Sequence, residues 1–103
     1  MRAALGVVMA AAGYPDSART GAVVEGLDRA ALRPGKVFHG GTRLESGRVV
    51  VSGGRVLCAV GLGNSVAAAQ AEAYALAELI RWPGVQYRHD IGYRAIARER
   101  ERR

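Results

Sequence analysis

Short apolar runs punctuated by glycine, in the middle of the chain, constrain the fold more than any other feature. The runs cover residues 36–44, 48–52 and 55–61, and each has the length of a strand. Glu45-Ser46-Gly47 separates the first two runs, and Gly53-Gly54 separates the last two. Adjacent glycines suit the positive φ angles of a tight hairpin turn. The pattern therefore predicts three antiparallel strands joined as a meander.

One long helix is predicted directly after these strands. Residues 66–81 are rich in alanine, the strongest helix former, and Ser65 or Asn64 can cap the first turn. Apolar residues recur along this run at steps of three and four, which gives the helix one stripe for packing. Pro83-Gly84 then ends the helix.

The flanking segments complete an α+β fold class. Their residues predict a buried strand, a second short strand, one helical turn, and a final strand or extended arm, at residues 5–12, 21–27, 28–32 and 85–91. From Tyr93 onward the chain returns to helical character with many charges. We expect one domain over residues 1–103, built as an antiparallel β-sheet with one main packed helix and a charged C-terminal helix.

Positive charge is concentrated at the C-terminal end of the chain. Lys and Arg number 15 against nine acids, for a formal charge of +6, and residues 94–103 alone hold five Arg and two Glu. This stretch is interpreted as a solvated helix end, with a phosphate-binding patch as the alternative. Aromatic residues are not interleaved with the bases, so no specific nucleic-acid partner is expected. The sequence holds no apolar span of membrane-crossing length, so no membrane partner is expected either.

The motifs that usually carry chemistry are missing or incomplete. Gly61-Leu62-Gly63 resembles the start of a dinucleotide-binding loop, but Val66 stands where its third glycine belongs. His39 and His89 have no cysteine or histidine neighbours at zinc-ligand spacing. Cys58 lies in an apolar strand and is interpreted as a buried, inert thiol. The residues therefore predict no catalytic group, no metal site and no cofactor site in this chain.

Three glycine-rich places have no obvious explanation in composition alone. They are Gly13-Tyr14-Pro15, Gly40-Gly41-Thr42 and Gly53-Gly54-Arg55. Glycine lets a backbone approach a ligand or another chain closely, and it serves ordinary turns equally well. Arg55 adds a planar donor array suited to phosphate or carboxylate, or it pairs with an acid on the sheet surface.

Five segments stand in order at residues 7–15, 36–42, 52–58, 69–74 and 87–95: VVMAAAGYP, KVFHGGT, SGGRVLC, AQAEAY and YRHDIGYRA. Together they resemble the C-terminal domain of phosphoribosylamine–glycine ligase. Gly40 departs from the family's usual alanine in a VFHAGT stretch, and the last segment is similar to its closing R-x-DIG-x-RA. The resemblance covers nearly the whole chain but only the final part of the full enzyme.

The resemblance implies a role in de novo purine (IMP) synthesis. The full enzyme belongs to the ATP-grasp superfamily and joins glycine to 5-phosphoribosylamine through a glycyl phosphate, converting ATP to ADP and phosphate. ATP and Mg²⁺ (or Mn²⁺) would be bound by the ATP-grasp and N-terminal domains, whose motifs this sequence lacks. The implied partners are those remaining domains, in the same chain or as a split subunit, and the implied location is the cytoplasm. This chain would complete the core and the substrate cleft.

The chain taken alone is therefore expected to be catalytically inactive. Met1 lies almost at the first predicted strand, so we expect a fragment, an excised domain or one part of a split gene, and the sequence leaves these three open. The alternative function is a free-standing basic module that binds RNA or a phosphorylated metabolite. Within the ligase, Gly53, Gly54 and Arg55 are predicted to face the substrate, with Arg55 contacting an anionic group of phosphoribosylamine or the glycine carboxylate.

Overall fold

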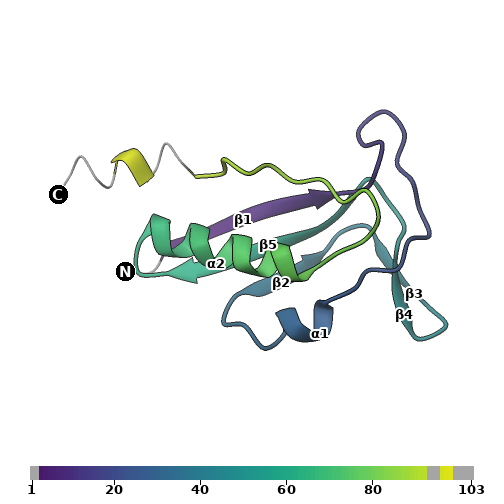
Figure 1. The fold of residues 1–103 in the computed structure, drawn as a ribbon, viewed down its shortest axis with the longest axis horizontal. Helices are drawn as coiled ribbons and strands as arrows, with labels where there is room; N and C mark the ends of the chain where they lie inside the picture. Colours follow the sequence, from purple (N-terminus) through teal and green to yellow (C-terminus); the bar gives the residue numbers. More distant parts are fainter. Residues whose placement is uncertain (1–2, 93–95, 99–103) are drawn as a thin grey trace.

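The computed structural model describes residues 3–92 and 96–98, and it confirms the α+β fold class (Figure 1). A long helix lies along one three-stranded sheet, and a separate two-stranded hairpin projects from one end (Figure 1). In chain order the elements are β1 (Ala3–Ala10), α1 (Leu27–Ala30), β2 (Lys36–His39), β3 (Thr42–Glu45), β4 (Arg48–Val51), β5 (Arg55–Gly63) and α2 (Val66–Leu79).

Strand β5 is the centre of the larger sheet, with β1 and β2 antiparallel on either side. In this register Val8, Cys58 and Phe38 lie side by side on one face. The neighbouring residues Val7 and Ala59 point to the opposite face and are fully buried. Because successive side chains of a strand point to opposite faces, one face of the sheet is buried and the other is partly exposed.

The predicted meander is wrong in its pairing. Strand β4 pairs with β3 rather than with β5, so Gly53-Gly54 links two sheets instead of closing a hairpin. Neither glycine has the positive φ angle that a two-residue hairpin turn needs. The predicted strand over residues 36–44 also breaks at Gly40-Gly41, which sends β2 to the larger sheet and β3 to the smaller one.

Helix α2 covers the buried face of the larger sheet. It begins after Ser65, whose hydroxyl accepts a hydrogen bond from the Ala68 N–H (3.1 Å), so the predicted cap is confirmed. Close packing is possible because Gly61 lacks a side chain: a Cβ there would lie 2.1 Å from the Ala69 carbonyl oxygen. Within the described residues, no helix is long and apolar enough to cross a membrane.

The core lies between α2 and the sheet and extends to the smaller hairpin. Its largest fully buried side chains include Met9, Val51, Val56, Leu76 and Ile80, which come from β1, β4, β5, α2 and the residue that caps α2. Long-range packing therefore ties the first strand to both sheets and to the helix.

The remaining predicted segments are only partly regular. Residues 21–27 form isolated bridges, Val23 to Val50 and Glu25 to Arg81, rather than a strand. The helical turn at 28–32 is present as α1, shifted by one residue at its start. The segment 85–91 is an extended arm attached to β1 through Gln86 and Ala10. Of the charged C-terminal helix, residues 96–98 are helical, and the rest of the prediction lies outside the described residues.

Candidate functional site

The three glycine-rich segments meet at the end of the larger sheet where β5 begins. A Cβ added to Gly54 would lie 2.4 Å from Cδ1 of Tyr14, so the tyrosine ring packs directly on this glycine. A Cβ added to Gly41 would lie 2.5 Å from the Arg55 carbonyl oxygen and 3.0 Å from the Gly53 Cα. Segments separated by dozens of residues in sequence thus form one tightly packed cluster.

Backbone hydrogen bonds hold this cluster together. The Ala11 N–H donates to the Gly54 carbonyl oxygen (2.7 Å), and the Ser52 N–H donates to that of Gly41 (2.8 Å). The Gly40 and Gly41 N–H groups both donate to the Val56 carbonyl oxygen, each at 2.9 Å. The position of the loop around Gly53 and Gly54 is therefore determined by main-chain contacts on both sides.

The glycines of the cluster make their close approaches to protein atoms. Gly54 and Gly41 are required by packing, since a methyl group at either would overlap a neighbour. Gly53 meets only the Gly41 Cα, at an ordinary contact distance of 3.5 Å. Gly40 likewise has room for a methyl group, with its nearest neighbour at 3.4 Å, which agrees with the alanine of the resembling VFHAGT stretch.

Arg55 is the exposed cation of this end of the sheet. As the first residue of β5, it lies opposite Ala10 at a break in the register of β1 and β5. Among the described residues its side chain has no hydrogen bond and no ion pair, so the predicted alternative of a surface acid partner is not found there. A guanidinium in this state can bind an anion without first breaking a pair.

Arg55 lines two cavities. The smaller, of about 210 Å³, is largely apolar and is lined by Val8, Phe38, His39, Gly40, Arg55, Leu57 and Cys58. The larger, of about 500 Å³, is lined by Val8, Ala10, Tyr14, Arg55, Gln86, Tyr87 and Arg88. Two arginines and no acid line the larger cavity, so it favours an anionic ligand.

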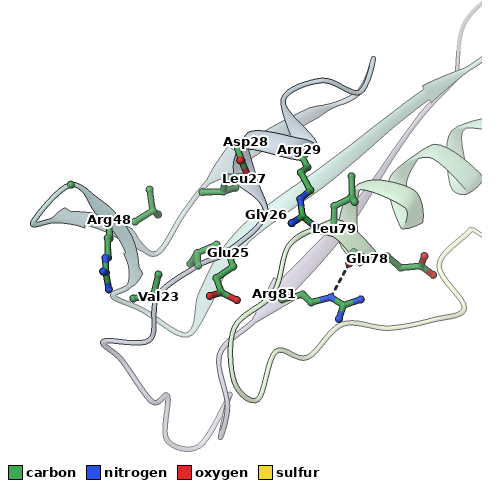
Figure 2. A pocket seen from close by; sticks show the side chains of 13 residues that line it. Val23, Glu25, Gly26, Leu27, Asp28, Arg29, Arg48, Glu78, Leu79 and Arg81 are labelled. Atoms are coloured by element: carbon green, nitrogen blue, oxygen red, sulfur yellow. Dashed lines mark hydrogen bonds between the residues drawn. The ribbon is translucent and has the colours of Figure 1, made fainter.

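A third cavity, of about 720 Å³, lies away from Arg55, between α1, β4 and the end of α2 (Figure 2). Figure 2 shows Arg48 and Glu78 on opposite sides of it, and the Arg81 Nε donates to the Glu78 carbonyl oxygen at 3.2 Å. Its charged lining balances three acids against three arginines: Glu25, Asp28, Glu78, Arg29, Arg48 and Arg81. Its volume makes this cavity a candidate binding site. The 500 Å³ cavity at Arg55 is the better candidate for an anionic ligand, because two arginines and no acid line it.

The remaining candidate groups show no arrangement for catalysis. The predicted burial of Cys58 is wrong: the residue is only half-buried, because it lies beside Val8 and Phe38 on the face that α2 does not cover. Its partial desolvation raises the pKa of the thiol, which opposes nucleophilic reactivity near neutral pH. His39 is hydrogen-bonded through Nδ1 to the Thr42 hydroxyl (2.9 Å). His89 stacks near Tyr74, with ring centroids 6.4 Å apart. The described residues contain no group of three His, Cys, Asp or Glu placed to hold a metal ion.

Sequence reasoning missed the residues of the extended arm. Gln86 and Arg88 reach the cavity because the arm returns along β1, and the backbone of Gln86 pairs with Ala10 in both directions (2.7 and 2.9 Å). The one local signal in the sequence that could have pointed to Arg88 is Asp90, two residues later. These two side chains form a bidentate ion pair (3.0 and 2.8 Å). That pair lowers the pKa of Asp90.

Known proteins resemble this chain over almost its full length. Residues 4–94 match the family described as phosphoribosylglycinamide synthetase, C domain. The phosphoribosylamine–glycine ligase of Pseudomonas syringae pv. tomato is 63% identical over 99 residues, covering 96% of this chain and 23% of that protein. The ligase of Vibrio vulnificus is 54% identical over 101 residues, covering 98% of this chain and 24% of the relative.

A solved structure agrees with these relatives in sequence and in fold. The crystal structure of phosphoribosylamine–glycine ligase from Thermotoga maritima superposes with a TM-score of 0.73 at 37% identity, covering 84% of this chain and 21% of that one. The chain thus spans about a quarter of the length of the proteins it matches. On the extent of the match, it belongs to the family of phosphoribosylglycinamide synthetase C domains.

Proposed function

We propose that this chain acts as the C-terminal domain of a phosphoribosylamine–glycine ligase, the enzyme that joins glycine to 5-phosphoribosylamine in purine synthesis. The observation that carries the proposal is the 63% identity to a ligase over 96% of this chain. A domain of this length would complete the ligase core and close one side of the substrate cleft. As an enzyme of nucleotide synthesis, the ligase would act in the cytoplasm.

The nucleotide chemistry belongs to the rest of the ligase in this proposal. The described residues include no cluster of acids suited to Mg²⁺, so we derive no step through a metal in this chain. ATP supplies the phosphoryl group that activates glycine, and the remaining domains would hold ATP and the metal. What this chain contributes is positioning of substrate and exclusion of water at one wall of the cleft.

Arg55 is the residue through which this chain would meet substrate. Arg55 is exposed, lines two cavities, and follows a loop whose backbone is fixed by Tyr14 and Gly41. Both substrates that join carry an anionic group, a phosphate on one and a carboxylate on the other. A guanidinium binds either through paired N–H donors. Gly53 and Gly54 would present Arg55 to the cleft by keeping this loop compact.

A chimeric ligase tests the proposed function. This chain would replace the matching residues of the Pseudomonas syringae relative, and the product would be assayed for ADP formation that depends on glycine and phosphoribosylamine. The chimera should restore growth without added purines to a host that lacks the ligase, whereas the relative truncated at the same point should not. A soluble chimera no more active than the truncated protein would contradict the proposal.

Arg55 variants of the chimera test whether this side chain meets substrate. We expect Arg55→Ala to lower kcat/KM by roughly 10- to 100-fold, with little change in the KM for ATP, because a charged hydrogen bond is removed. Arg55→Lys should rescue only part of this activity, since lysine lacks the planar fork. Arg48→Ala is the matched control, because Arg48 also begins a strand directly after a glycine. Wild-type kinetics in both Arg55 variants would refute the substrate-binding role of Arg55.

A further inference from the structure

The larger cavity at Arg55 is built from segments far apart in the sequence. Tyr14 and Arg55 form one wall, and the arm that returns along β1 after α2 supplies Gln86, Tyr87 and Arg88 (Figure 1). At about 500 Å³ the cavity is much larger than a single amino acid such as glycine requires. Its lining combines two cations with neutral hydrogen-bonding groups.

The arm is held in a fixed position, so Arg88 is placed at the cavity before any ligand arrives. The Tyr74 hydroxyl donates to the Arg88 carbonyl oxygen (2.7 Å) and accepts from the Ile91 N–H (2.9 Å). Gln70 on the same helix donates to the Ile91 carbonyl oxygen (2.9 Å). These bonds anchor both ends of the arm's last turn to α2. The backbone that carries Arg88 is therefore fixed before any ligand binds.

The side chain of Arg88 is oriented by Asp90. Nε donates to Oδ1 at 3.0 Å and Nη2 donates to Oδ2 at 2.8 Å, so the carboxylate engages one edge of the guanidinium. A guanidinium has five N–H donors, and this pair engages donors on Nε and Nη2. Asp90 offsets part of the charge of Arg88, while Arg55 has no such partner among the described residues.

We propose that this cavity binds the phosphate end of a sugar phosphate, with Arg55 and Arg88 as the phosphate contacts and Tyr14, Gln86 and Tyr87 beside the sugar. A phosphate monoester carries about two negative charges near neutral pH and several acceptor oxygens, which suits two guanidinium groups. Phenol and amide groups match sugar hydroxyls, and Val8 and Ala10 give the cavity an apolar floor.

The inference rests on the proposed function for the identity of the ligand. Phosphoribosylamine is the substrate that carries a phosphate, so Arg55 would meet this substrate rather than the carboxylate of glycine. Arg88 becomes a second phosphate ligand on a segment more than thirty residues away in the chain. The sugar would then extend from the cavity toward the rest of the ligase, where its amine reacts.

Nuclear magnetic resonance titration of the 103-residue chain tests the site directly. Ribose 5-phosphate is the probe, with inorganic phosphate, ribose and glycine as comparison ligands, and the backbone N–H and arginine Nε–H signals are followed. Ribose 5-phosphate should give saturable shifts at residues of both walls, whereas glycine and ribose should not. Inorganic phosphate should shift the same arginine signals with weaker affinity, because it lacks the sugar.

Matched variants separate a built site from general attraction between charges. Arg55→Ala and Arg88→Ala should each weaken ribose 5-phosphate binding by about 10-fold or more, because each removes charged hydrogen bonds to the phosphate. Arg48→Ala is the control for Arg55. Arg43→Ala is the control for Arg88, because Arg43 pairs with the acid two residues later, as Arg88 does. Both controls should bind within about 2-fold of the original chain, since neither side chain lines the cavity.

Three results would overturn the inference: no saturable binding of ribose 5-phosphate, unchanged affinity in Arg88→Ala, or equal weakening in Arg43→Ala. If Arg88→Ala loses its dispersed spectrum, Arg88→Lys keeps the charge and should still bind several-fold more weakly. The inference and the proposed function fail differently. If the chimera is active but the chain binds no sugar phosphate, only the proposed site is refuted. If the chain binds the sugar phosphate but its chimera is inactive, only the proposed ligase function is refuted.

Discussion

At the scale of single residues, the glycines next to Arg55 have different physical roles. Gly54 lies under the ring of Tyr14, with 2.4 Å between a hypothetical Cβ and Cδ1, whereas Gly53 has space for a methyl group. Neither has a positive φ angle, so backbone conformation does not require glycine at either position. The difference between them is one of packing, which makes the pair a sensitive test of this end of the sheet.

We expect Gly54→Ala to lower the free energy of unfolding by about 1–3 kcal/mol, because the methyl group must displace the Tyr14 ring or the loop. Gly53→Ala is the matched control. It should change the free energy of unfolding by less than about 1 kcal/mol, because its main effect is to lower the conformational entropy of the unfolded chain. Urea unfolding followed by circular dichroism measures both. Equal effects in the two variants would show that the ring does not pack on Gly54.

The ion pair between Arg33 and Glu72 joins the loop after α1 to α2. Nε and Nη2 of Arg33 donate to the two carboxylate oxygens at 2.9 and 2.8 Å. The hydrogen bonds from Arg33 lower the pKa of Glu72. A carboxyl group whose pKa is lowered by folding adds stability above its unfolded pKa, and that stability is lost as pH falls through the folded pKa.

Glu72→Gln should therefore lower Tm by a few degrees at pH 7 and by progressively less as pH falls below about 4.3, the ordinary value for glutamate. Glu45→Gln is the control, because the Arg43–Glu45 pair is half-exposed on both sides and is screened by solvent. Thermal unfolding over a range of pH measures both variants. A Tm difference that stays constant down to pH 3 would contradict this account of Glu72.

The sequence identified most residues of this site but not how they pack together. The local pattern of glycines was enough to single out the three glycine-rich places and Arg55. That Tyr14, Gly41 and Gly54 pack into one cluster depends on how β1, β3 and β5 are arranged, and local propensity carries no information about such distant neighbours. Arg88 was missed for the same reason, because an extended arm has no periodicity from which its neighbours can be inferred.

At the scale of elements, strand and helix positions were easier to predict than strand pairing. The alanine-rich run predicted α2 within two residues of its end, since helix signals are local. The link at Gly53-Gly54 was predicted as a hairpin turn, but β5 instead pairs with β1 and β2. Strand β5 is covered by α2 on one face and needs two partners, so its pairing is decided by burial across the whole domain.

The packing of α2 on β5 depends on glycine at the sheet surface. A Cβ at Gly61 would lie 2.1 Å from the Ala69 carbonyl oxygen and 2.2 Å from the Ala73 nitrogen. We expect Gly61→Ala to destabilise the domain by about 2–3 kcal/mol, because the helix backbone must move away from the sheet. Chemical denaturation at neutral pH measures the change in stability.

Gly6→Ala is the control for this prediction, because Gly6 lies on the neighbouring strand and on the face that α2 does not cover. Its new methyl group would meet the Cys58 sulfur at 2.9 Å, the end of a side chain that can turn aside. We expect this variant to be destabilised by less than about 1 kcal/mol. If Gly6→Ala lowers the free energy of unfolding more than Gly61→Ala does, the packing of α2 is not the reason that glycine is needed at position 61.

At the scale of the whole molecule, the uncovered face of the larger sheet is its most unusual surface. Val8 and Phe38 lie side by side with Cys58 on this face, and these two residues are 49% and 57% exposed. The face continues into both cavities at Arg55. Exposed apolar surface of this kind marks a site of contact with another protein surface. In the proposed ligase, that surface would belong to the remaining domains.

The separate chain should therefore associate with itself through this face, despite its formal charge of +6. Phe38→Ser removes the largest exposed ring and should raise the concentration at which association begins by about 10-fold, since burial of such a side chain contributes about 1.5–3 kcal/mol. Leu44→Ser is the control, because Leu44 is 75% exposed on the separate hairpin. Sedimentation velocity over a range of concentrations measures all three proteins. If the chain is strictly monomeric at high concentration, the exposed face is not a contact surface. That result would favour an independent binding module, because such a module needs no partner domain to cover this face.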